Sequence, residues 1–79
     1  MRERLRELAG QTFGLAVAEV PEDASPEVVP QWDSLNHIEL MLSLEMEYGV
    51  QISSELLPEL ISIDAIEDYL HEQGVNGVR

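Results

Sequence analysis

Apolar residues recur at helical spacing in three stretches of the chain, each bounded by residues that commonly start or end helices. The first covers residues 2 to about 14 and can end at Gly14; its repeating positions are Leu5, Leu8, Ala9, Thr12 and Phe13. The second runs from Ser34 to Tyr48, before Gly49. The last follows Ser62, a residue type preferred at N-caps, and ends near Gln73-Gly74, with Ile63, Ile66 and Leu70 predicted to be buried. The pattern predicts an all-α fold, with a frayed tail from Val75 to Arg79.

The segments between these helices contain the prolines. A long connection from about Leu15 to Trp32 holds Pro21, Pro26 and Pro30, and such a length is unusual in a compact helical domain. We expect four valines to hold it against the helices: Val17, Val20, Val28 and Val29. Between Glu55 and Ile61, Pro58 would remove a helical hydrogen bond. An irregular turn or a very short helix is therefore predicted there.

The helix from Ser34 to Tyr48 carries two apolar stripes. One stripe consists of Leu40, Met41, Leu44 and Tyr48. The other consists of Leu35, Ile38 and Leu42, and it is bordered by Glu39 and Glu45, both expected at the surface. Only part of so wide an apolar surface is needed to face a small core, so the second stripe can remain partly exposed for partners. The alternative is a central helix with both stripes buried.

The start of this helix is a candidate site. Pro30 favours an extended or turning backbone before it, Asp33 is a suitable N-cap, and Ser34 falls in the first turn with its hydroxyl in water. The free N–H groups and the dipole of a helix start favour an anion. A phosphate ester on Ser34 would suit this position, although Asp33 would oppose its second negative charge. Taken alone, the tripeptide Asp-Ser-Leu favours an ordinary capped helix start over a modification site.

Composition restricts the classes of function. The 79 residues are expected to form a single domain, residues 1–79, and they include no cysteine, so any reactive thiol has to come from a cofactor. The net charge is −12, and the basic residues are Arg2, Arg4, Arg6 and Arg79, of which the first three are expected on or near the solvated side. Nucleic acid and anionic membranes are poor partners for such an acidic chain, whereas basic protein surfaces are good ones. The alternative is that the many acidic side chains serve only to keep the protein soluble. No secretory signal or membrane span is evident, so a cytoplasmic protein is expected.

The sequence contains few residues arranged for catalysis or for metal binding. A hydrolase would have to combine Ser34 with His37 and Asp33, but nothing else in the sequence supplies an oxyanion site or a water-poor cleft. We therefore expect no catalytic residue, and we interpret His37 as a solvated or capping side chain. His71 suits the C-terminus of the last helix. No metal-ligand spacing is present, so no metal site is expected.

Together, several motifs resemble the acyl carrier protein family over nearly the whole chain. These motifs are Phe13-Gly14-Leu15 with Glu19-Val20, Asp33-Ser34-Leu35, Ile38-Glu39-Leu40, Leu44-Glu45, Glu47-Tyr48-Gly49-Val50, and Ala65 with Asp68-Tyr69-Leu70. The resemblance implies an all-α four-helix bundle with a long loop between helices 1 and 2 and a short irregular third helix. It also implies a carrier that is not itself an enzyme.

By the same resemblance, Ser34 is the attachment point of 4′-phosphopantetheine, which a phosphopantetheinyl transferase moves from coenzyme A. Leu35 would help the transferase to recognise the site, and Asp33 would assist at its magnesium centre. The arm's thiol would carry acyl or aminoacyl groups as thioesters. The face presented to loading enzymes and to downstream synthases with basic docking surfaces would consist of Leu35, Ile38, Glu39, Leu42 and Glu45.

The sequence departs from the family pattern at a few positions. Gln31 stands where many members have glycine, and Trp32 replaces a small residue. Pro58 interrupts the third helix, and Met46 takes a position that is usually acidic. These departures favour a carrier of a specialised pathway, serving polyketide, nonribosomal or similar intermediates, over a housekeeping fatty-acid carrier. The alternative is an unmodified, carrier-like helical module for protein–protein interaction.

Overall fold

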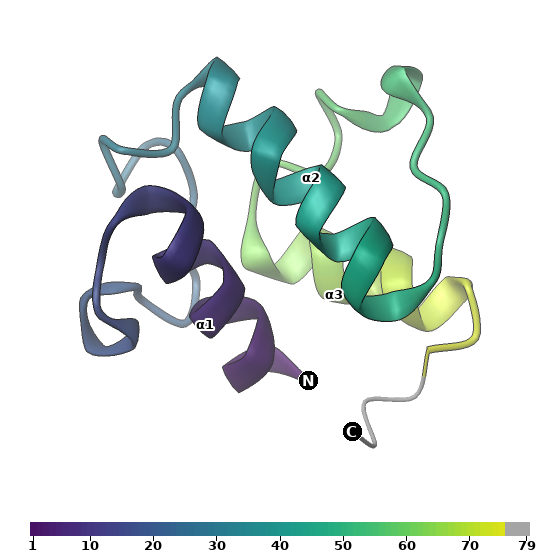
Figure 1. Ribbon diagram of the computed structural model, residues 1–79, viewed down its shortest axis with the longest axis horizontal. Coiled ribbons are helices and arrows are strands. Elements are labelled where there is room, and N and C mark those ends of the chain that lie inside the picture. Colours follow the sequence, from purple (N-terminus) through teal and green to yellow (C-terminus); the bar gives the residue numbers. More distant parts are fainter. Residues whose placement is uncertain (76–79) are drawn as a thin grey trace.

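Three α-helices form the main part of the fold, which is known from a computed structural model that describes residues 1–75 (Figure 1). They are α1 (Arg2–Phe13), α2 (Ser34–Tyr48) and α3 (Ile63–Glu72), and two 3₁₀ turns lie between them, η1 (Val17–Glu19) and η2 (Ser54–Leu56). No β-strand occurs within residues 1–75. The all-α prediction is therefore confirmed. Residues 76–79, most of the tail expected to fray, lie outside the described part of the chain.

Local chemistry sets the ends of these helices as the sequence predicted. Gly14 and Gly49 end α1 and α2 in the left-handed conformation, with φ of 76° and 66°, which glycine adopts without the steric cost of a Cβ. Asp33 caps α2, and the Ser62 hydroxyl accepts the Ala65 N–H at 3.0 Å at the start of α3. The helices therefore begin and end close to the expected residues.

The third helix of the expected four is reduced to the single turn η2. Pro58 follows this turn almost at once and has no N–H with which to continue a helix. The chain instead makes isolated bonds, such as that from the Leu60 N–H to the Leu56 carbonyl at 3.1 Å. The prediction of a short irregular segment is confirmed. The count of four helices is not, because residues 1–75 contain three α-helices.

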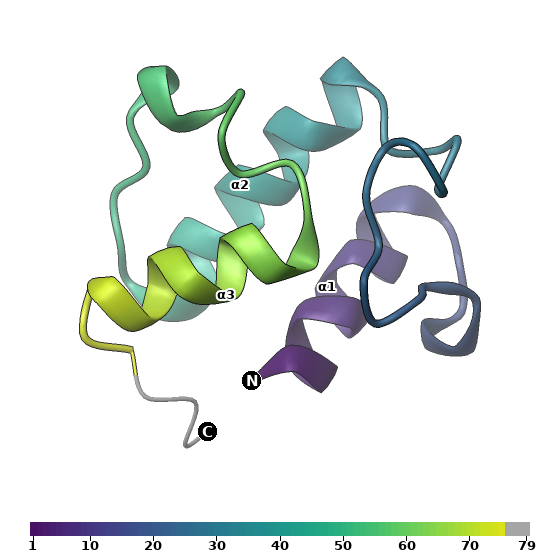
Figure 2. The same cartoon turned by 180° about the vertical axis from the view of Figure 1, so that it is seen from behind.

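Helix α1 packs against both α2 and α3. Its apolar face meets the buried stripe of α2 and the buried residues of α3 in one core, to which residues of the α1–α2 connection also belong. The core residues are Leu5, Leu8, Ala9, Phe13, Val20, Ala24, Val29, Trp32, Leu40, Met41, Leu44, Tyr48, Leu60, Ile63, Ile66 and Leu70. Figures 1 and 2 show the long α1–α2 connection beside α1 and η2 at the opposite edge of the molecule. The core thus extends into the connection.

The α1–α2 connection is held by buried residues, but not by all of the expected valines. Val20 and Val29 are buried, and Val17 is half-buried. Val28 is exposed, so its expected packing role is wrong. Ala24 is buried as well, and its carbonyl accepts the Ile63 N–H at 3.0 Å. This bond joins the connection directly to the start of α3.

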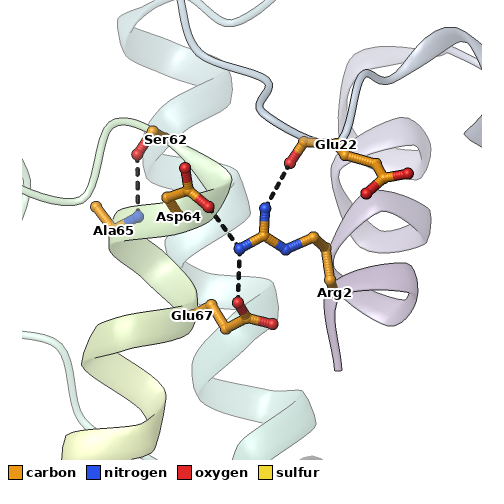
Figure 3. A network of polar contacts seen from close by, with 6 residues as sticks. All are labelled: Arg2, Glu22, Ser62, Asp64, Ala65 and Glu67. Atoms are coloured by element: carbon orange, nitrogen blue, oxygen red, sulfur yellow. Dashed lines mark hydrogen bonds and ion pairs between the residues drawn. The ribbon is translucent and has the colours of Figure 1, made fainter.

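The arginines of α1 do more than face solvent. The Arg2 guanidinium reaches Asp64 at 2.5 Å and Glu67 at 2.6 Å, both on α3, and donates to the Glu22 carbonyl at 3.1 Å (Figure 3). The hydrogen bond to Glu67, and to a smaller extent the one to Asp64, raises the pKa of Arg2 above its ordinary value. Arg2 thereby connects α1 with α3 and with the α1–α2 connection.

Two further arginines extend this pattern. Arg4 forms an ion pair with Glu47 of α2 at 2.9 Å. The hydrogen bond to Glu47, and to a smaller extent the one to Glu7, raises the pKa of Arg4 above its ordinary value. Arg6 donates to the carbonyls of Val20 and Val17 at 2.7 and 3.1 Å. The arginines were expected on or near the solvated side, and they are half-buried. The sequence analysis did not foresee that these three side chains join α1 to α2, to α3 and to the connection.

Candidate functional site

The start of α2 is fixed by its own side chains. Asp33 has an extended backbone, and its Oδ1 accepts the Asn36 N–H at 2.9 Å. The Asn36 side chain in turn donates to the Gln31 carbonyl at 2.8 Å. Ser34 is the first residue of the helix and is exposed. The predicted N-cap and the position of Ser34 in the first turn are both confirmed.

Trp32 anchors the chain just before this helix start. Its side chain is only 3% exposed, and its ring packs against Phe13 with centroids 5.4 Å apart. Its indole N–H donates to Nδ1 of His37 at 2.9 Å, and Nε2 of His37 lies 2.7 Å from the Leu57 carbonyl. An indole N–H can only donate and a carbonyl can only accept, so these partners assign the neutral imidazole tautomer with its proton on Nε2.

His37 is therefore not the solvated or capping side chain that the sequence analysis expected. It is 9% exposed, and both of its ring nitrogens are engaged by Trp32 and Leu57. The correction has a physical reason: at helical spacing, His37 falls in the middle of the stripe that contains Leu40, Met41 and Leu44. Since the imidazole is turned into the core and fully bonded, it cannot serve as the base for Ser34.

A hollow of about 310 Å³ lies beside the start of α2. We name it the Ser34 hollow; its lining residues are Pro26, Trp32, Asp33, Ser34, His37 and Ile61. Three separate segments build it: the connection, the start of α2 and the segment before α3. Sequence reasoning did not associate Ile61 with the site, and it noted Trp32 only as a departure from the family pattern. The one available signal was a large aromatic residue at Trp32, where the family pattern has a small one.

The two stripes of α2 differ sharply in exposure. Leu40, Met41, Leu44 and Tyr48 are buried, whereas Leu35 is 66%, Ile38 46% and Leu42 54% exposed. Of the two alternatives left by the periodicity, the exposed second stripe is the one that the structure supports. Met46, 88% exposed, continues this stripe towards the end of α2, and the sequence analysis had noted it only as a departure.

The two acids that border the exposed stripe are not equivalent. Glu39 is exposed, as expected. Glu45 is half-buried, and its Oε2 accepts the Ile52 N–H at 2.7 Å. Glu45 therefore also holds the segment that leaves α2, a structural role that the expectation of a surface acid missed.

Three further observations on residues 1–75 concern His71, metal ions and membrane helices. His71 lies in the last turn of α3, as predicted. Within these residues, no group of three or more His, Asp or Glu side chains is arranged to hold a metal ion. The helices found there are also too short or too polar for any of them to cross a membrane.

Comparison with known proteins gives the family. No protein-family model matches the chain. It is, however, 36% identical over 69 residues to a Streptomyces avermitilis protein named polyketide-8 synthase acyl carrier protein 2, an alignment that covers 87% of this chain and 79% of that protein. The Asp33-Ser34-Leu35 motif lies at the capped and exposed start of α2. The chain belongs to the acyl carrier protein family.

Proposed function

We propose that this chain is a carrier protein that bears 4′-phosphopantetheine on the Ser34 hydroxyl, transferred from coenzyme A by a phosphopantetheinyl transferase. The observation that carries the proposal is the exposed Ser34 at the first position of a capped helix, in a chain of this family. When bound, the group supplies a thiol that holds acyl chains as thioesters. The chain has no cysteine of its own to compete with that thiol.

The residues around Ser34 fit a phosphodiester. The first turn of the 15-residue helix α2 presents N–H groups and the positive end of its dipole. Asp33 would repel the phosphate, but its Oδ1 accepts the Asn36 N–H, which directs part of its charge into the cap. An ester on Ser34 also needs no rearrangement of the core, because this side chain already faces solvent.

The exposed stripe of α2 is proposed as the partner face. Leu35, Ile38 and Leu42 would give apolar contact area. The exposed Glu39 and the half-buried Glu45 would pair with basic residues of the partner. The net charge of −12 favours encounter with basic surfaces. The proposed partners are the transferase, an acyl-loading enzyme and downstream synthases that share this docking chemistry.

The cargo is proposed to be a polyketide intermediate, because the similar Streptomyces avermitilis protein is named as a polyketide synthase carrier. Nothing comparable favours aminoacyl or nonribosomal cargo. The carrier would perform no chemistry on that cargo. His37, the histidine nearest to Ser34 in sequence, is held inward by Trp32 and Leu57 and so offers no general base.

The test is the intact mass after incubation with coenzyme A, magnesium and a broad-specificity phosphopantetheinyl transferase. The parent should gain the mass of one phosphopantetheine, and the Ser34→Ala variant should gain none. If the folded parent gains no mass with several transferases, the chain is instead an unmodified interaction module. In that case Ser34→Ala would also leave its cellular function intact.

A further inference from the structure

We infer that the Ser34 hollow receives the first, branched part of the phosphopantetheine arm, with Trp32 and Ile61 as its apolar walls. This inference rests on the proposed function and adds to it a binding role for residues outside the Asp-Ser-Leu motif. It concerns the base of the arm and not the cargo.

The first argument for this inference is the position of the hollow next to Ser34. Ser34 itself lines it, so a group esterified to the Ser34 hydroxyl begins at its edge. Pro26, Trp32 and Ile61 give it apolar walls. Beyond its phosphate, the arm continues into a carbon that bears two methyl groups, and only farther out into two amides. The apolar walls therefore match the part of the arm that is nearest to Ser34.

Hydrogen bonds near both walls give the second argument. The bond from the Trp32 indole to His37 fixes the ring, and the bond between His37 and the Leu57 carbonyl ties the segment preceding Ile61 to α2. The Trp32 ring is thus positioned relative to Ser34 before any arm is attached, and the chain that leads to Ile61 is anchored at Leu57. A preformed site loses less conformational entropy on binding than one that must be ordered.

The third argument is the size of the Ser34 hollow. At about 310 Å³ the hollow lies at the lower end of the range of about 300–1,000 Å³ for small-molecule pockets. It can accept the base of the arm but not the arm together with a long acyl chain. The thiol end would then remain outside and accessible to partner enzymes.

The experiment compares the unmodified and the phosphopantetheine-loaded chain by NMR, with loading verified by intact mass. Trp32 is the sole tryptophan of the sequence, so its indole resonances are unambiguous. Loading should shift the indole N–H resonance and produce nuclear Overhauser contacts between the arm's methyl protons and the indole ring. The Ile61→Ser variant should lose most of this contact intensity. The matched Met46→Ser variant, at an exposed apolar residue outside the hollow, should retain it.

The possible outcomes separate the two proposals. A loaded chain without methyl–indole contacts would overturn the inference and leave the carrier function standing. Equal contacts in the parent and in Ile61→Ser would remove Ile61 from the walls and also overturn it. Failure of the parent to load would overturn the carrier function, and the inference with it.

Discussion

The buried indole N–H of Trp32 donates to Nδ1 of His37, a residue in the first turns of α2, across 2.9 Å. This bond joins the residue that precedes Asp33-Ser34 to the helix that follows it. Through Nε2 of His37 and the Leu57 carbonyl it also reaches the segment after η2. One imidazole thereby holds together the three parts of the chain that surround Ser34.

His37→Phe should destabilise the protein by about 1–3 kcal/mol, because it leaves the buried Trp32 N–H and the Leu57 carbonyl without their partner. Urea unfolding followed by circular dichroism measures this change. A double-mutant cycle with Trp32→Phe should give a coupling energy of about 0.5–3 kcal/mol. Simple additivity of the two single changes would show that the bond contributes nothing.

Glu45→Ala should lower the free energy of unfolding by about 1–2 kcal/mol, because the Ile52 N–H loses a charged acceptor. Glu45→Gln retains an acceptor oxygen and should lose less. Glu39→Ala, at the exposed acid of the same helix, should stay within about 0.5 kcal/mol of the parent. Equal stability of the two alanine variants would argue against the structural role of Glu45.

Gly10→Ala should destabilise the protein although alanine is the better helix former. The gain in helix propensity is about 1 kcal/mol, but an added Cβ would lie 2.6 Å from the Leu15 carbonyl oxygen. That oxygen belongs to the backbone, so relief requires a shift of the chain that costs about 1–3 kcal/mol. Thermal unfolding should show a lower Tm than for the parent. Gln11→Ala, at the exposed neighbouring position, serves as control, and a rise in Tm for Gly10→Ala would contradict the predicted clash.

Arg2→Gln should cost up to about 1 kcal/mol, since its ion pairs with Asp64 and Glu67 are partly exposed. The difference between parent and variant should shrink as salt screens the pairs. Unfolding in urea at low and high sodium chloride measures both effects. A difference that is independent of salt would mean that Arg2 acts through packing or through its bond to the Glu22 carbonyl instead.

Leu42 and Leu44 provide a matched pair for the partner face. Leu42→Ala should leave stability nearly unchanged but raise the KM of the transferase for this chain several-fold, because Leu42 is exposed on the proposed face. Leu44→Ala should instead cost about 2–5 kcal/mol of stability, since Leu44 is buried in the core. If Leu42→Ala leaves KM unchanged for every partner tested, the partner face lies elsewhere.

Features that depend on neighbouring residues were predictable from the sequence. The Asp33 cap and the glycine ends of α1 and α2 follow from chemistry within one or two helical turns. The exposure of Leu42 beside the buried Leu44 was one of two alternatives that the helical periodicity left open. The short third segment followed from Pro58, although the expected four helices did not. The all-α class was correct because helical periodicity dominated the chain.

Features that join distant residues were missed. His37 was assigned to solvent because its polar character outweighed its helical position, and its partner Leu57 lies 20 residues away. Arg4 meets Glu47 across 43 residues, and Arg2 meets Glu67 across 65. No local pattern in the sequence specifies such pairs, because they exist only once the helices have packed.

The exposed stripe of α2 has a consequence for how such a carrier can be engineered. Leu35 and Leu42 project outward from a helix whose opposite side already satisfies the core. We therefore expect substitutions at these two positions of the proposed partner face to change the choice of partner enzyme without redesign of the scaffold. Glu45 lacks this freedom, since a change there also releases the Ile52 N–H. Libraries that vary partner choice are best built on Leu35, Ile38 and Leu42, with Glu45 left in place.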